Sequence, residues 1–127
     1  MASLFTQIIA GEVPGQIVWQ DEGHVALLTI APIYEGHTLV IPRKEVDSWL
    51  EMSDVEYVEL MLACKKVGDI LKDVFNKNKV VQIIQGFEVS HVHVHLIPAN
   101  NAEECPFPPS RMASAEELKI VAKKIRQ

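Results

Sequence analysis

Apolar and polar residues alternate along several short stretches of the chain, and glycine, proline or polar turns separate these stretches. Alternation with a period of two is typical of β-strands, because successive side chains of a strand point to opposite faces of the sheet. The pattern predicts strands over residues 16–20, 25–30, 37–41, 80–84 and 91–98. The second of these stretches is nearly all apolar, which favours burial on both of its faces.

One long helix is predicted between the third and fourth strands, over residues 53–74. Ser53 and Glu56 have the spacing of a capping box, and a polar segment from Asn76 to Lys79 ends the pattern. The apolar positions follow a helical rhythm and predict the face that packs on the core: Val55, Val58, Met61, Leu62, Val67, Ile70, Leu71 and Val74.

Two shorter helical segments complete the prediction. Apolar residues have near-helical spacing over residues 4–10, and Ser114 with Glu117 forms a second capping box that begins a short C-terminal helix ending near Ile125. The order of elements indicates an α+β fold with a five-stranded antiparallel sheet, one long helix and a short C-terminal helix. At 127 residues, we expect a single domain over 1–127.

Composition narrows the classes of function. The formal net charge of -5 argues against broad binding to nucleic acid, because a basic surface supplies most of that affinity. No apolar run approaches the ~18 residues of a membrane span, and the first residues lack the features of a signal peptide. Two cysteines do not make a disulfide framework. We therefore expect a cytoplasmic protein that binds neither membranes nor nucleic acid and carries no cofactor.

The last predicted strand contains three of the five histidines of the chain, His91, His93 and His95. They alternate with aliphatic residues, so a strand places three imidazoles on one face and the aliphatic side chains on the other. The aliphatic face requires a core, and the imidazole face is available for chemistry near neutral pH. The simpler alternative is three solvated histidines on an exposed strand.

Two kinds of chemistry use such a row of histidines. A metal ion is one, but the outer histidines of a regular strand lie about 13 Å apart, so one ion cannot bind all three. In the other, His93 attacks phosphorus or a carbonyl carbon, and its neighbours orient it, hold the anionic oxygens and pass a proton to the leaving group. Gly86 would allow backbone N–H groups to approach a phosphate closely.

The two remaining histidines have different surroundings. His37 follows a glycine and begins a strand that ends at Pro42, and we expect it to orient one of the three clustered histidines. The alternative is a purely structural histidine. His24 follows Gly23 in a turn, and we expect it on the surface.

Three segments together resemble the histidine triad (HIT) family. His91 to Ile97 matches its His-x-His-x-His signature followed by two apolar residues, Gly36 to Pro42 matches a Gly-His-x-Leu-Val-Ile-Pro segment, and Phe5 to Pro14 is similar to a third segment. The resemblance extends over residues 3–98 and leaves the C-terminal tail from Asn100 uncovered.

The resemblance implies a homodimer that binds a purine nucleotide and cleaves or transfers a nucleoside monophosphate at the α-phosphorus. Typical substrates are adenosine phosphoramidates and dinucleoside polyphosphates. It implies that His93 is the nucleophile, that His91 and His95 flank the phosphate and the leaving group, and that His37 completes the set. It also assigns a purine pocket to Leu4, Phe5, Ile8, Leu27, Ile30 and Leu39, for which plain core packing is the alternative.

Some positions depart from the family pattern. Thr29 replaces an acid or amide that grips the ribose, Phe87 and Glu88 replace residues that donate to the phosphate, and Gln85 is a substitute for the family's amide. Ser3 and Thr6 stand where some members have zinc-binding cysteines, and hydroxyls are poor zinc ligands, so no metal is expected. Thr29 and Glu88 favour an alternative function, a nucleotide-binding regulatory or interaction protein with little turnover.

Overall fold

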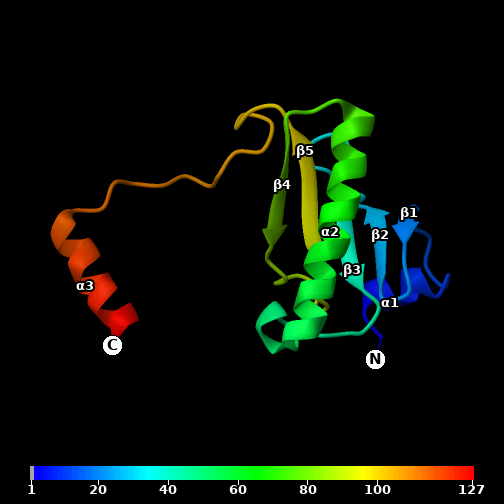
Figure 1. Ribbon diagram of the computed structural model, residues 1–127, viewed down its shortest axis with the longest axis horizontal. Coiled ribbons are helices and arrows are strands. Elements are labelled where there is room, and N and C mark those ends of the chain that lie inside the picture. Colours follow the sequence, from blue (N-terminus) through cyan, green and yellow to red (C-terminus); the bar gives the residue numbers. More distant parts are fainter. Residues whose placement is uncertain (1) are drawn as a thin grey trace.

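A computed structural model of the chain, described over residues 2–127, confirms the α+β architecture. Its five strands form one antiparallel sheet in the order β1-β2-β3-β5-β4 (Figure 1). Their bounds are Ile17–Gln20 for β1, His24–Leu28 for β2, Thr38–Pro42 for β3, Lys79–Ile84 for β4 and Val94–Ala99 for β5. β5, which follows the histidines, lies between β3 and β4 and is therefore supported on both edges.

The long helix α2, Asp54–Phe75, packs along one face of the sheet (Figure 1). Ser53 and Glu56 form the expected capping box, and Asn76 ends the helix in the left-handed conformation with φ 51°. The buried stripe of the helix consists of Leu60, Ala63, Cys64, Val67 and Leu71. These side chains meet the aliphatic residues that alternate with the histidines, Val92, Val94 and Leu96.

The expected core face of α2 was only partly right. Five of the apolar residues assigned to it are exposed, namely Val55, Val58, Leu62, Ile70 and Val74. The sheet contacts one stripe of the helix, and this stripe contains the small residues Ala63 and Cys64, whose size allows close approach. Apolar residues on the neighbouring stripes therefore remain outside the contact.

The short helix α1, Leu4–Ile9, covers the opposite face of the sheet. Its Phe5 and Ile8 pack on Leu27, Leu39 and Ile41, forming a second and smaller core. Leu39 and Val40 point to opposite faces because they are consecutive in a strand, so the two cores lie on the two sides of β3. A 3-10 turn, Trp49–Glu51, leads from β3 toward α2.

Two strand boundaries differ from the sequence prediction by more than one residue, the end of β2 and the beginning of β5. β2 ends at Leu28, the residue paired with Thr38 at the beginning of β3, so Thr29 and Ile30 have no strand to pair with and Ile30 is fully exposed. β5 begins at Val94, so His91 and His93 precede it. In that segment the Val92 N–H donates to the carbonyl of Val46 at 2.7 Å, outside the sheet.

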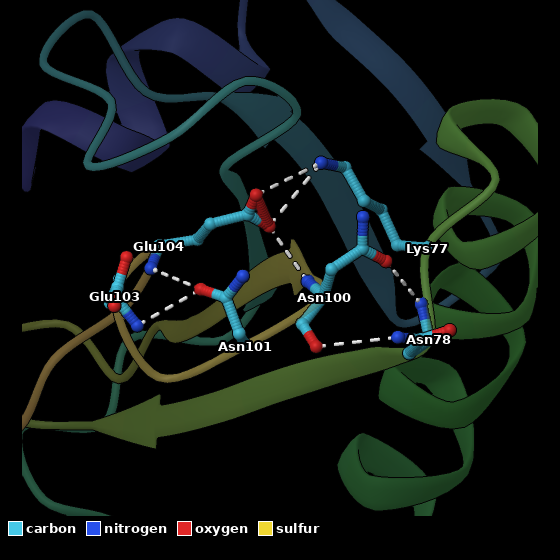
Figure 2. A network of polar contacts seen from close by, with 6 residues as sticks. All are labelled: Lys77, Asn78, Asn100, Asn101, Glu103 and Glu104. Carbon is cyan, nitrogen blue, oxygen red and sulfur yellow. Dashed lines mark hydrogen bonds and ion pairs between the residues drawn. The ribbon is translucent and has the colours of Figure 1, made fainter.

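A polar network fixes the chain where it leaves β5 (Figure 2). The Glu104 carboxylate accepts from the backbone N–H of Asn100 at 2.7 Å and from Lys77 Nζ at 3.3 Å. Lys77 also lies 4.7 Å from the centre of the Tyr34 ring, in the loop that precedes His37. The turn after β5 and the loop before His37 are therefore held by the same lysine and glutamate.

The C-terminal helix α3, Ala115–Arg126, has its predicted capping box but stands apart from the sheet at the end of an extended segment (Figure 1). None of its residues is buried. Within residues 2–127, no helix combines the length and the apolar character needed to cross a membrane.

We predict that Gly36→Ala destabilises the fold. Gly36 has φ 90°, and a Cβ atom there would lie 2.7 Å from Cε2 of Phe75 and 2.9 Å from Cγ of Pro98. Strain and overlap together are expected to cost about 2 kcal/mol in the free energy of unfolding, measured by urea denaturation. Gly23→Ala is the matched control, because a Cβ at Gly23 meets nothing within 4 Å. Equal stability of the two variants would contradict this reading.

Candidate active site

His93 is held in one tautomer by its own segment of chain. Its Nδ1 lies 2.7 Å from the carbonyl oxygen of His91, and a carbonyl only accepts, so Nδ1 carries the proton. The other nitrogen, Nε2, therefore has a free lone pair in the neutral ring. The Phe5 ring meets His93 edge to face with centroids 4.8 Å apart. This is the arrangement that a nucleophilic imidazole requires.

A second chain of contacts sets the tautomers of His37 and His95. The backbone N–H of Ile33 donates to His37 Nδ1 at 3.0 Å, so the proton of a neutral His37 is on Nε2. His37 Nε2 lies 2.9 Å from His95 Nδ1 and donates to it. The remaining nitrogen of His95, Nε2, therefore carries a hydrogen. The rings of His93 and His95 are neighbours, with centroids 5.1 Å apart.

Burial keeps these imidazoles uncharged. Burial, with smaller contributions from the nearby His93 and His37, lowers the pKa of His95 to about 4. Burial also lowers the pKa of His37. His95 is therefore neutral at neutral pH.

His91 is fully buried and has no free nitrogen. Its Nε2 lies 2.7 Å from the carbonyl oxygen of Pro42, and its Nδ1 lies 2.6 Å from the hydroxyl of Ser3. The row of histidines thus divides by environment, since His91 is enclosed by protein groups while His95 is only half-buried. This division follows from the tertiary structure and is not visible in the His-x-His-x-His spacing.

Four residues assigned to the purine pocket come together beside the histidines. Phe5, Leu27 and Leu39 are buried and Ile8 is partly buried in the core beneath α1. Leu39 is also paired with His95 across β3 and β5. The two other assigned residues, Leu4 and Ile30, are exposed, and Ile30 lies beyond the end of β2.

The polar residues assigned to substrate binding lie in two loops. The Thr29 hydroxyl accepts a hydrogen bond from the backbone N–H of Ala31 at 3.2 Å. Gln85 and Gly86 line a hollow of about 340 Å³ together with Trp49 and Val92. Glu88 is exposed in the loop that leads to His91.

The expectation that His24 lies on the surface was wrong. His24 begins β2, is paired with Pro42 of β3 and is only 7% exposed. Its Nδ1 lies 3.0 Å from Asp21 Oδ1, which also accepts from the backbone N–H groups of Gly23 and His24. The aspartate that closes the turn between β1 and β2 thus supplies the polar partner that makes burial of this histidine possible.

Residues that the sequence alone did not assign complete the surroundings of His91. Ser3 is the N-cap of α1, and Thr6 and Glu45 bond to it or to each other. Within residues 2–127, no three His, Cys, Asp or Glu side chains lie close enough together to hold a metal ion. The spacing of Ser3 and Thr6 at the start of a helix could have indicated from the sequence that these two residues act together. Glu45 lies 42 residues from Ser3, and no local pattern in the sequence links it to them.

We predict that stability falls between about pH 6.5 and pH 4 because of His95. The unfolded chain binds a proton at His95 near its ordinary pKa of 6.5, whereas the folded chain binds one only near about 4. The stability that neutral His95 contributes is fully present above the pKa of the unfolded chain, and it is lost as the pH falls through this window. His95→Asn should show a weaker pH dependence of the urea midpoint than the original chain. Identical pH dependence would contradict the assignment.

Comparison with known proteins identifies the family. The family model described as HIT domain matches residues 10–102. An uncharacterised HIT-like protein of Methanocaldococcus jannaschii is 39% identical, over 75% of this chain and 77% of that protein. The adenosine 5'-monophosphoramidase of Schizosaccharomyces pombe is 33% identical, over 98% of this chain and 96% of that protein.

Solved structures agree with this result. A HIT family protein from Bacillus subtilis superposes with a TM-score of 0.82 and 26% identity, covering 99% of this chain and 96% of that chain. A protein from Streptococcus mutans gives a TM-score of 0.83 and 30% identity, covering 97% of this chain and 82% of that chain. The match of the family model over most of the chain, the relatives and the shared fold show that this chain belongs to the HIT family.

Proposed function

We propose that this chain is a nucleotide hydrolase or transferase that cleaves at the α-phosphorus of a nucleoside 5'-phosphoramidate or a dinucleoside polyphosphate. The observation that carries the proposal is the fixed tautomer of His93, whose Nδ1 is bonded to the His91 carbonyl at 2.7 Å while Nε2 is free to attack. The relative named adenosine 5'-monophosphoramidase, which aligns over nearly the whole chain, supports the phosphoramidate class.

The first step forms a covalent intermediate. The lone pair on His93 Nε2 attacks the α-phosphorus, and the bond between phosphorus and the leaving nitrogen or oxygen breaks with its electron pair going to the leaving group. Loss of the Nδ1 proton is not required, and the His91 carbonyl stabilises the positive charge that develops on the ring. The product of this step is a nucleotidyl group on His93.

His95 supplies the proton for the leaving group. A phosphate bound near His95 favours the charged imidazolium and raises the pKa of His95 above about 4. Both nitrogens of the charged ring carry hydrogens, so the His37 ring must turn its Nε2–H away from His95 Nδ1 at this stage. The Nε2–H of His95 then donates to the departing nitrogen or oxygen. In the second step a water molecule attacks phosphorus, His95 takes a proton from that water, and the bond from phosphorus to His93 breaks to release the nucleoside monophosphate.

His91 and His37 act through the other two histidines in this mechanism. His91 holds His93 by its backbone carbonyl, and His37 holds His95 by a bond of 2.9 Å. We propose that the purine lies at the edge of the apolar cluster of Phe5, Leu27 and Leu39, next to the partly buried Ile8. Gln85, Gly86, Glu88 and Thr29 are proposed to contact the phosphate and ribose from the surrounding loops.

We predict that His93→Ala abolishes turnover and leaves nucleotide binding largely intact, because the lost interaction is made in the transition state. Intact-mass spectrometry of protein quenched during turnover of adenosine 5'-phosphoramidate should show one added adenylyl group on the original chain and none on the variant. His24→Ala is the control for loss of a histidine outside the site. Turnover by His93→Ala equal to that of the original chain would remove the covalent mechanism. Nucleotide binding without turnover by the original chain would favour a regulatory binding protein.

We further infer that the protein is a homodimer. Leu118, Val121 and Ile125 form an apolar stripe on one face of α3. Their side chains are 58%, 50% and 74% exposed in the single chain. β4 is an edge strand of the sheet, with Ile83 exposed on it. A second copy would cover these surfaces, and an uncovered amphipathic helix has little reason to fold.

This inference predicts that Val121→Glu combined with Ile125→Glu weakens self-association. Light scattering coupled to size exclusion should give the mass of two chains for the original protein and a concentration-dependent decrease for the double variant. Ile120→Glu is the matched control, because Ile120 lies on the opposite side of α3 from the stripe. A monomeric mass for the original chain at all concentrations would contradict the inference.

A further inference from the structure

A hydrogen-bonded network connects an exposed carboxylate to the most deeply buried histidine. Glu45 Oε1 accepts from the backbone N–H of Ser3 at 2.6 Å and from the Thr6 hydroxyl at 2.7 Å. The Ser3 hydroxyl lies 2.6 Å from His91 Nδ1 and accepts from the backbone N–H of Thr6 at 3.1 Å. The carboxylate is therefore separated from the imidazole by a single serine.

The same loop holds His91 at both of its nitrogens. Pro42 is the last residue of β3, and its carbonyl accepts from His91 Nε2 at 2.7 Å. Glu45, three residues later, reaches Nδ1 through Ser3. A 180° flip of the His91 ring would therefore break the hydrogen bonds at both nitrogens.

Two groups that can only accept hydrogen bonds, the Pro42 carbonyl and the Glu45 carboxylate, determine the direction of each bond in the network. The Pro42 carbonyl only accepts, so His91 Nε2 carries a hydrogen and the Ser3 hydroxyl donates to Nδ1 of the neutral ring. The Glu45 carboxylate only accepts, so the hydrogen of the Thr6 hydroxyl points to it. These hydrogen bonds to the backbone of Ser3 and then to Thr6 hold the pKa of Glu45 below its usual value, which keeps it an acceptor.

The network touches the two features on which the proposed reaction depends. The His91 backbone carbonyl fixes the tautomer of His93. Ser3 is also the N-cap of α1, and α1 places the Phe5 ring against His93 and, with centroids 5.9 Å apart, against His91. A displacement of Glu45 would therefore disturb His93 in two ways, through the His91 carbonyl and through the Phe5 ring.

We propose that Glu45 is a positioning residue for His93, acting through Ser3, Thr6 and His91, an inference that rests on the proposed function for its kinetic consequence. Glu45 does not touch the substrate. Its hydrogen bonds hold the beginning of α1 and the histidine segment as one rigid unit. Preorganisation of this kind raises the rate of the chemical step more than the affinity for substrate.

Nitrogen-15 NMR of the histidine side chains tests the geometry without any turnover. In the original chain, His91 should give the Nε2–H tautomer and His93 the Nδ1–H tautomer. Glu45→Ala and Ser3→Ala should each shift the His91 Nδ1 signal and broaden that of His93. Lys44→Ala is the matched control, since Lys44 is the neighbouring residue but pairs with Glu56 at 2.9 Å. Unchanged histidine signals in a folded Glu45→Ala variant would overturn the proposal.

Kinetics provide the second measurement. Glu45→Ala should lower kcat about tenfold with a smaller change in KM, the size expected for a small displacement of reacting groups. Glu45→Gln keeps an oxygen that accepts both bonds and should retain most of the activity. The double variant with Ser3→Ala should be no worse than the more damaging single variant, because both interrupt one path. Additive losses, or a Gln variant as damaged as Ala, would overturn the proposal.

The two measurements separate this inference from the proposed function. If the original chain gives no adduct and no nucleoside monophosphate, the proposed function fails and the NMR comparison still decides the role of Glu45. If turnover occurs and depends on His93 but not on Glu45, the proposed function stands and the positioning role fails.

Discussion

The hydrogen bond from His93 Nδ1 to the carbonyl of His91 is the contact on which the rest of the site depends. It joins two residues of the same segment at 2.7 Å, and it determines which nitrogen of His93 has a free lone pair. The segment stays outside the sheet, with the Val92 N–H bonded to the Val46 carbonyl, until Val94, where β5 begins between two neighbouring strands.

The sheet makes this contact precise by separating packing from chemistry. The aliphatic residues of the histidine segment enter the core under α2, while the histidines and Leu39 face the side covered by α1. Because the side chains alternate, any movement of the histidines would require movement in a close-packed core. Burial on that side also keeps His37 and His95 neutral, since it disfavours the charged imidazolium.

Each of the two series of histidine hydrogen bonds starts at a backbone group. The Ile33 N–H begins the chain through His37 and His95, and the Pro42 carbonyl begins the one at His91. Unlike an imidazole or a hydroxyl, a backbone group cannot exchange the roles of donor and acceptor. The fold therefore sets the position of each of these protons.

The sequence by itself determined the features that depend on local periodicity. The alternation from His91 to Leu96, the two capping boxes and the five strands were all predictable, because each depends on residues a few positions apart. Only the tertiary structure decided which stripe of α2 is buried, that His24 is buried against Asp21, and that Glu45 meets Ser3. These outcomes depend on contacts between distant segments, and a local pattern carries no information about which distant residue completes a hydrogen bond or covers an apolar side chain.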